Sequence, residues 1–340
     1  MSEAIINKRK ETWKKFIDLN SSLNNVYIIH YMPDVLTRPQ LWPSKKNERI
    51  EWAWRMYSLH MERIEWLDDD SIPYLDMLTG TEIFAEAFGC KVHRDENNMP
   101  FALPLIKQAS DVSRLKVPDL WDSSLAYLFE MADELKRRAG KDALLRMVDI
   151  QSPIDIAALI FDKNYFYIAL LEEPEMIHEL TSKIKDLLTA FLDEWFARYG
   201  KEFIAHFPTY YMPQGITLSE DEVGVVNKAM FDEFFLPELN ELSDRYGGIG
   251  IHCCADSEHQ WENFKKIRNL KMLNLVRSPE STRNSWSFFA DFTAQFPQWY
   301  GEGEPWTWPS QYPKNAKIAL QTLANTKDEA LRLSEKLRSF

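Results

Sequence analysis

The alternation of apolar and polar positions along the chain predicts a repeated succession of strands and helices. Apolar runs typical of buried strands lie at residues 26–32, 144–152, 210–219, 249–254 and 272–276. Stretches with helical periodicity lie at residues 123–139, 154–162, 174–199, 228–246 and 261–267. Because strands and helices alternate, we expect a parallel sheet with crossover helices. The predicted α/β fold is a single (β/α)8 TIM barrel, with an open doubly wound sheet as the alternative.

The two ends of the chain are expected to be helical. Residues 1–20 have an amphipathic helical pattern, and Ala316–Phe340 is interpreted as one or two further helices. The acidic run Asp68–Asp70 is expected to end a helix, and no strand is predicted between residues 280 and 312. Since no break in composition divides the chain, we predict one domain over residues 1–340. Residues 1–70 would form an N-terminal helical extension and the first barrel unit.

Composition and charge narrow the class of protein. Apolar residues make up 45% of the chain and charged residues 27%, which is typical of a soluble globular protein. The net charge of −12 argues against nucleic acid as a partner, because phosphate backbones repel an acidic protein. No apolar run reaches the roughly 18 residues of a membrane span, and the charged N-terminus does not resemble a signal peptide. With three cysteines, an odd number, we expect a cytoplasmic protein with reduced thiols.

Reactive side chains follow several of the predicted strands, and the carboxyl ends of barrel strands form the active face. These residues are His30 and Asp34, Asp149 and Gln151, Ser219 to Glu222, and His252, Cys254 and Asp256. Asp149 directly follows an apolar run, and a buried acid needs a partner or a function. His60 is interpreted as a surface or helix residue, and His206 is a weak candidate ligand.

The stretch I-G-I-H-C-C-A-D at 249–256 contains the strongest candidate metal ligands. Residues two apart on a strand share a face, so His252 and Cys254 would project together while Cys253 points away. Nitrogen and sulfur ligands suit zinc, with Asp221 or Glu222 as a third ligand. The alternative is an ordinary strand end with a buried thiol. S-E-D-E at 219–222 also matches a capping box, with Ser219 as the N-cap.

Several stretches, in this order, resemble the uroporphyrinogen decarboxylase superfamily. They are G-T-E-I-F-A-E-A-F-G-C-K-V, L-K-V-P-D-L, D-I-Q-S-P-I-D-I-A-A-L-I-F, L-E-E-P-E-M-I-H-E-L-T, L-S-E-D-E, F-D-E-F-F-L-P-E-L and G-I-H-C-C-A-D, within roughly residues 70–276. The superfamily includes zinc-dependent methyltransferases that take methyl groups from corrinoid proteins. The resemblance implies a (β/α)8 barrel. The decarboxylase branch has an arginine-rich N-terminal segment, of which only Arg38 is present here. His252 and Cys254 match the first two zinc ligands of the methyltransferase branch, whose third cysteine is absent.

The resemblance implies an enzyme that moves a methyl group between a corrinoid, carried by a partner protein, and a thiol or similar acceptor. His252, Cys254 and Asp221 would bind zinc, which lowers the pKa of a bound thiol. Asp149 and His30 are the expected catalytic residues, and Gln151, Arg38 and Tyr211 the expected substrate-binding residues. One alternative is a carboxy-lyase acting on a tetrapyrrole or another polycarboxylate. The other is a barrel that binds a small ligand without turnover.

Overall fold

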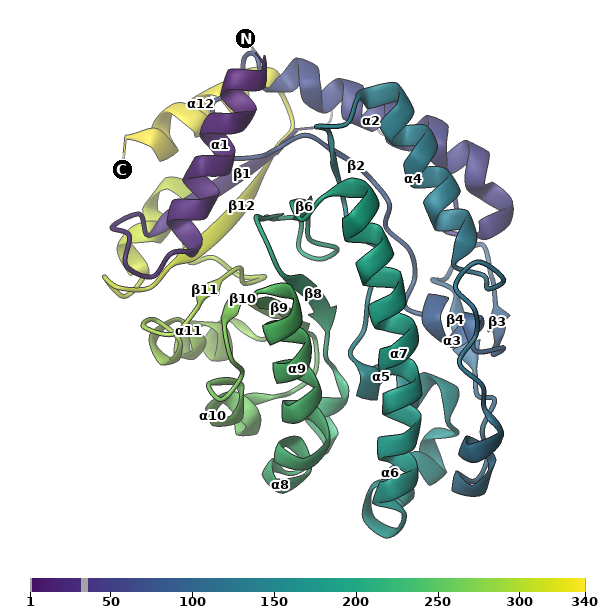
Figure 1. Ribbon diagram of the computed structural model, residues 1–340. Coiled ribbons are helices and arrows are strands. Elements are labelled where there is room, and N and C mark those ends of the chain that lie inside the picture. Colours follow the sequence, from purple (N-terminus) through teal and green to yellow (C-terminus); the bar gives the residue numbers. More distant parts are fainter. Residues whose placement is uncertain (1, 32–35, 340) are drawn as a thin grey trace.

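Parallel strands form most of a ring in the computed structural model, which describes residues 2–31 and 36–339 (Figure 1). Six of these strands are hydrogen-bonded to one another in a single sheet, and all of them are parallel. The order is β1 (Asn25–Tyr31), β12 (Ile318–Ala324), β11 (Ala294–Gln295), β10 (Leu270–Leu275), β9 (Ile249–Cys253) and β8 (Ile216–Ser219). Asp34, predicted to follow the first strand, lies outside the described residues.

The remaining strands complete the ring through short pairings. β2 (Tyr74–Leu75) pairs in parallel with β5 (Leu144–Leu145), and β6 (Phe203–Ile204) forms a hairpin with β7 (Tyr211–Met212). Parallel bridges from Arg146 to Ile204 and from Gln151 to Ser219 place β6 and β8 on the same side of β5. The described residues thus form eight ring positions: β1, β2, β5, β6 with β8, β9, β10, β11 and β12. This arrangement confirms the predicted (β/α)8 barrel.

Acidic side chains, rather than a strand ladder, join β1 to the segment that leads into β2. The carboxylates of Asp69 and Asp70 accept hydrogen bonds from the amides of Ile29 and Tyr27, each at 3.0 Å. The amide of Asp70 in turn donates to the carbonyl of Tyr27 at 2.9 Å. The acidic run was predicted to end a helix, but α2 already ends at Arg63. The carboxylates of Asp69 and Asp70 instead accept the hydrogen bonds that main-chain carbonyl groups of a neighbouring strand would accept from β1.

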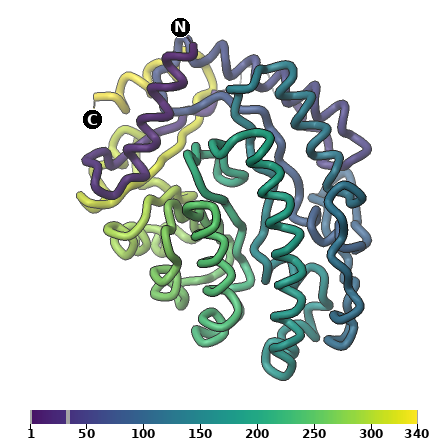
Figure 2. Tube along the Cα trace, in the orientation of Figure 1, coloured from purple at the N-terminus to yellow at the C-terminus, as the bar shows by residue number. Residues whose placement is uncertain are grey.

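Helices surround the ring and cover its outer face (Figures 1 and 2). They are α1 (Ser2–Ile17), α2 (Lys46–Arg63), α3 (Ile83–Ala87), α4 (Ala126–Ala139), α5 (Pro153–Ile160), α6 (Lys163–Glu172), α7 (Pro174–Tyr199), α8 (Lys228–Met230), α9 (Leu236–Tyr246), α10 (Trp261–Phe264), α11 (Pro279–Phe288) and α12 (Lys327–Arg338). A π-helical turn, Phe231–Phe235, lies between α8 and α9, and an antiparallel pair, β3 (Lys91–His93) and β4 (Phe101–Leu103), packs beside α5. Within the described ranges, no helix combines the length and apolar character needed to span a membrane.

The chain termini lie on one side of the ring, where α1 and α12 both bind the acidic run (Figure 2). Arg9 of α1 forms an ion pair with Asp69 at 3.0 Å, and Arg338 of α12 forms one with Asp70 at 2.9 Å. The pairs bring opposite ends of the sequence to the junction of β1 and β2. They also neutralise two carboxylates that would otherwise be buried without a counter-ion.

The C-terminal region differs from the sequence prediction. Residues 318–324 form the strand β12, which pairs along its whole length with β1, and only α12 is helical there. The strand β11 also lies in the 280–312 region, for which no strand was predicted. A strand that is buried on both faces has no alternating pattern, so a short apolar run is easily mistaken for part of a helix.

Candidate functional site

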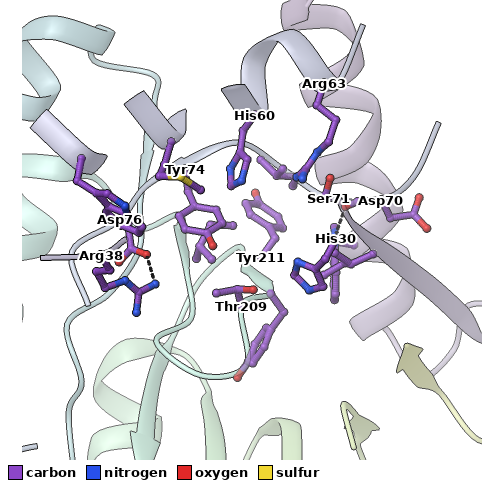
Figure 3. Close-up of a pocket in the computed structure, with 17 residues that line it drawn as sticks. His30, Arg38, His60, Arg63, Asp70, Ser71, Tyr74, Asp76, Thr209 and Tyr211 are labelled. Carbon is purple, nitrogen blue, oxygen red and sulfur yellow. Dashed lines mark hydrogen bonds and ion pairs between the residues drawn. The ribbon is translucent and has the colours of Figure 1, made fainter. Parts of the chain in front are cut away.

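A cavity of about 250 Å³ lies between β1, β2, α2 and the β6–β7 hairpin (Figure 3). Its polar lining includes His30, Arg38, His60, Arg63, Tyr74, Asp76, Thr209 and Tyr211. Three of the predicted site residues, His30, Arg38 and Tyr211, therefore share one cavity. The hydroxyl of Tyr211 donates to Glu202 at 2.6 Å, so this side chain already has a partner for its polar atom.

Asp76 is the most constrained acid in the cavity. Its carboxylate accepts hydrogen bonds from Arg38 at 3.1 Å, from Arg146 at 3.0 Å and from the amide of Leu78 at 2.8 Å. Burial alone would raise the pKa of Asp76, but the two guanidinium groups and the hydrogen bond from the Leu78 amide lower this pKa overall. Asp76 is therefore ionised at neutral pH. Sequence analysis missed this residue, although it directly follows the apolar stretch S-I-P-Y-L.

Arg38 lies at the exposed side of the same cavity. Its guanidinium stacks over the ring of Trp52, 4.8 Å from the ring centroid, while bonding to Asp76. The side chain is 40% exposed, so the guanidinium keeps donors available to a ligand. The predicted contact between Arg38 and substrate stays a prediction.

Two neutral histidines line the cavity. Nε2 of His30 lies 2.9 Å from Oε1 of Gln321, and because an amide oxygen only accepts, Nε2 carries the proton. Nδ1 of His30 thus keeps its lone pair. Burial lowers the pKa of His30, and it lowers the pKa of His60 to about 3. His60, interpreted from sequence as a surface or helix residue, lies in α2 and is buried, because α2 turns this face toward the junction of β1 and β2.

A second polar cluster follows β5 and includes the predicted residue Asp149. Nε2 of His206 lies 2.9 Å from the hydroxyl of Ser219, which donates to Asp149 at 3.4 Å. The other ring nitrogen of His206 lies 3.1 Å from the hydroxyl of Thr217. Burial raises the pKa of Asp149 to about 7 and lowers that of His206 well below its usual range. Asp149 can therefore hold or release a proton near neutral pH.

Arg146 connects this cluster to the cavity. Its guanidinium binds Asp76 through Nη1 and donates to the carbonyl of His206 through Nε, at 2.9 Å. The ring of His206 lies 6.4 Å, between centroids, from the ring of His252. Polar groups thus extend continuously from the cavity to the ends of β5, β8 and β9. Gln151 belongs to this edge through its bridge to Ser219.

The two cysteines of the strand-end motif differ in burial. Cys254 is exposed, whereas Cys253 is buried and contacts Ser257 on the opposite side. Nδ1 of His252 lies 2.5 Å from Oδ1 of Asn274. The carboxylate of Asp221 accepts from the thiol of Cys254 at 2.9 Å and from its amide at 2.6 Å. Two of the three predicted metal ligands are therefore in direct contact.

The implied zinc does not fit the side chains as they are placed. In the part of the chain that the structure describes, no three His, Cys, Asp or Glu side chains are grouped to hold a metal ion. A catalytic zinc usually needs three protein ligands. Partial burial, together with the hydrogen bond to Asp221, raises the pKa of Cys254 to about 12. This thiol is therefore protonated at neutral pH.

The backbone amides of the loop that carries Asp221 are capped by Asp155, and not by Ser219 as predicted. The carboxylate of Asp155 accepts from the amides of Asp221 and Glu222, at 2.7 and 3.0 Å. The capping box with Ser219 as N-cap was wrong, since the Ser219 hydroxyl contacts His206 and Asp149 instead. Glu222 forms an ion pair with Lys163 at 2.7 Å, which leaves it a poor metal ligand.

Comparison with known proteins identifies the family and the fold. Residues 68–280 match the family model described as uroporphyrinogen decarboxylase (URO-D). A search of curated proteins found no match. Among solved structures, a methyltransferase from Methanosarcina mazei superposes with a TM-score of 0.65, at 10% identity, over 97% of each chain. At this identity the structural likeness concerns the fold alone, and it agrees with the ring of strands described above.

Proposed function

The chain belongs to the uroporphyrinogen decarboxylase family, and from that premise we propose that it is an enzyme that transfers a methyl group to a small anionic thiol. The substrate would occupy the cavity between β1, β2 and the β6–β7 hairpin. The observation that carries the proposal is the lining of this cavity, in which two arginines lie with two neutral histidines, while its two acids, Asp70 and Asp76, are already paired with arginines. The fold shared with a methyltransferase from Methanosarcina mazei supports the choice of reaction.

The cavity offers the groups that methyl transfer needs. A thiol attacks a methyl group as the thiolate, and nearby guanidinium groups such as those of Arg38 and Arg63 lower the pKa of a thiol. The thiol proton passes to Nδ1 of His30, which keeps a lone pair because Nε2 bonds to Gln321. The thiolate sulfur then forms a bond to the methyl carbon, and the bond from that carbon to the donor breaks with its electron pair on the donor. In keeping with the family resemblance, the proposed donor is a methylated corrinoid on a partner protein.

In the proposed reaction, arginines rather than zinc lower the pKa of the substrate thiol. Among the described residues, no three side chains are grouped to bind a metal ion. The thiol of Cys254 donates to the carboxylate of Asp221 and stays protonated at neutral pH. Asp76 has a positioning role, since it holds Arg38 against the cavity and Arg146 against the backbone of His206.

Decarboxylation of a small carboxylic acid is the second candidate. It is favoured by the convergence of Arg38 and Arg63 on one cavity, because guanidinium groups bind carboxylates well. A tetrapyrrole is a poor candidate substrate. The cavity holds about 250 Å³, whereas pockets for drug-sized ligands span roughly 300–1,000 Å³.

The deciding experiment offers the purified protein methylcobalamin as donor, with 3-mercaptopropionate as the anionic thiol and 2-mercaptoethanol as its neutral counterpart. We expect loss of methylcobalamin absorbance and formation of the S-methyl product, faster with the anionic thiol and without added zinc. His30→Gln should lower the rate roughly a hundredfold. No methylation of any thiol or folate acceptor, with or without zinc, would refute methyl transfer. Release of CO2 from short dicarboxylates in the same preparation would favour the carboxy-lyase instead.

A further inference from the structure

We propose that His60 and Arg63 form a subsite for one oxyanion group, a carboxylate, at the α2 side of the cavity. The proposal rests on the proposed function in placing the ligand in this cavity, but it concerns binding only. Figure 3 shows both side chains reaching from α2 toward the cavity. They lie one helical turn apart, three positions along the chain, so they share one face of the helix.

Arg63 is a buried cation that has no counter-ion among the residues the structure describes. The residue is 7% exposed, and within the described ranges no carboxylate oxygen lies close enough for an ion pair with it. Its recorded hydrogen bond runs from Nη1 to the carbonyl of Tyr31, at 3.2 Å, and its Nε has no partner among the described residues. The nearby acid Asp69 is already paired with Arg9. Burial lowers the pKa of Arg63, because removing a charge from water is unfavourable.

Other buried arginines of the chain have different surroundings. Arg9 and Arg146 each form an ion pair with a carboxylate, at 3.0 Å in both cases. Arg49 has no carboxylate partner within the described ranges, but it does not line the cavity, and its two terminal nitrogens bond to Leu78 and Tyr127. Among these four arginines, Arg63 is the one that lines the cavity, and it has no ion-pair partner in the part of the chain that the structure describes.

His60 supplies a second unpaired group beside it. The residue is 9% exposed, and its Nδ1 has no hydrogen-bond partner among the described residues. The imidazole is neutral, and with its proton on Nε2, the ring nitrogen that protein atoms do not enclose, it donates one hydrogen bond to an oxygen of the ligand. Its ring packs edge-on against Tyr74, with centroids 5.4 Å apart, which fixes its orientation.

The chemistry of the subsite favours an organic carboxylate. One guanidinium and one neutral imidazole balance a single negative charge, and a planar carboxylate matches the two parallel donors of a guanidinium. The cavity is also lined by the apolar side chains of Ile28, Met56 and Ile72, which suit a short hydrocarbon chain. A free inorganic anion would use the same donors but not these apolar contacts.

The test compares propionate with sulfate as probes, using the full-length protein. Wild type should gain thermal stability with propionate, and more than with sulfate at equal ionic strength. Arg63→Met should lose this gain, with the apparent affinity for propionate reduced at least about tenfold. Arg55→Met, an exposed arginine on the same helix, is the matched control and should bind propionate like wild type.

A second readout separates binding from a structural role. Removing an unpaired buried charge should raise the melting temperature of ligand-free Arg63→Met, whereas loss of a structural contact would lower it. If Arg63→Met does not fold, His60→Phe can be compared with wild type instead, because this variant keeps the charge of Arg63. The affinity of His60→Phe for propionate should also be lower than that of wild type. A destabilised Arg63→Met that binds propionate like wild type would overturn the proposal, as would protection by sulfate alone.

The outcome is distinguishable from failure of the proposed reaction. Propionate binding that depends on Arg63, in a protein that methylates no thiol, would support the subsite and refute methyl transfer. Methyl transfer by Arg63→Met with an unchanged KM for 3-mercaptopropionate would refute the subsite alone.

Discussion

The cavity beside α2 and the Cys254–Asp221 pair at the strand ends both contain ionisable side chains, but these are partnered differently, although the neighbouring Glu220 carboxyl also has no partner among the described residues. At the strand ends, Asp155 caps two backbone amides and Asp221 binds both the thiol and the amide of Cys254. In the cavity, Arg63 and His60 have polar atoms without partners among the described residues. A motif with the residue types of a metal site can thus be satisfied internally. Unsatisfied buried groups point more directly to a ligand.

The largest expected effect on stability comes from substitution of Asp76, whose carboxylate binds the guanidinium groups of both Arg38 and Arg146. Asp76→Asn removes the carboxylate that pairs with Arg146 in a site where both side chains are at most 6% exposed. We expect a loss of about 3–5 kcal/mol in the free energy of unfolding, because an uncompensated buried charge remains. Chemical denaturation measures this loss. Asp244→Asn, which breaks the exposed ion pair with Arg268, is the control and should change the stability far less than Asp76→Asn does.

The pH dependence of stability tests the environment of Asp149. Its pKa is raised to about 7 by burial, so the folded state binds this proton more tightly than the unfolded state does. The resulting stabilisation is complete below the pKa of the unfolded state, near 4, and is lost as pH rises through about 7. Between pH 4 and pH 8, wild type should therefore lose up to about 4 kcal/mol more than Asp149→Asn, which does not titrate. Identical pH profiles for the two proteins would contradict the buried position of Asp149.

The architecture could be predicted from sequence because it rests on local patterns. The run Pro174 to Tyr199 shows helical periodicity and ends at a glycine, and the structure places α7 at these residues. β12 was mistaken for helix because its buried apolar run, Ile318–Leu320, is short and does not alternate with polar residues. The family resemblance within residues 70–276 agrees with the matched range 68–280.

The cavity could be predicted only in part. His30, Arg38 and Tyr211 were selected, but His60 and Arg63 lie in a helix whose local sequence does not separate them from the exposed Arg55. Their burial depends on the junction between β1 and β2, which Asp69 and Asp70 close by long-range contacts. A pattern of near neighbours along the chain does not contain this information.

The smallest effect is expected at the strand-end motif, where Cys254→Ser tests the implied zinc directly. The thiol is exposed, is paired with Asp221 and belongs to no three-ligand group among the described residues, so we expect well under one zinc per chain in wild type and in the variant. Because a serine hydroxyl can donate to the same carboxylate, unfolding should change by no more than about 0.5 kcal/mol. Mass spectrometry of protein purified reduced, without a metal-binding tag, gives the zinc content. Near-stoichiometric zinc in wild type that falls in Cys254→Ser would mean that His252, Cys254 and Asp221 come together around the ion. In that event the activation of the thiol would move from the cavity arginines to the strand ends.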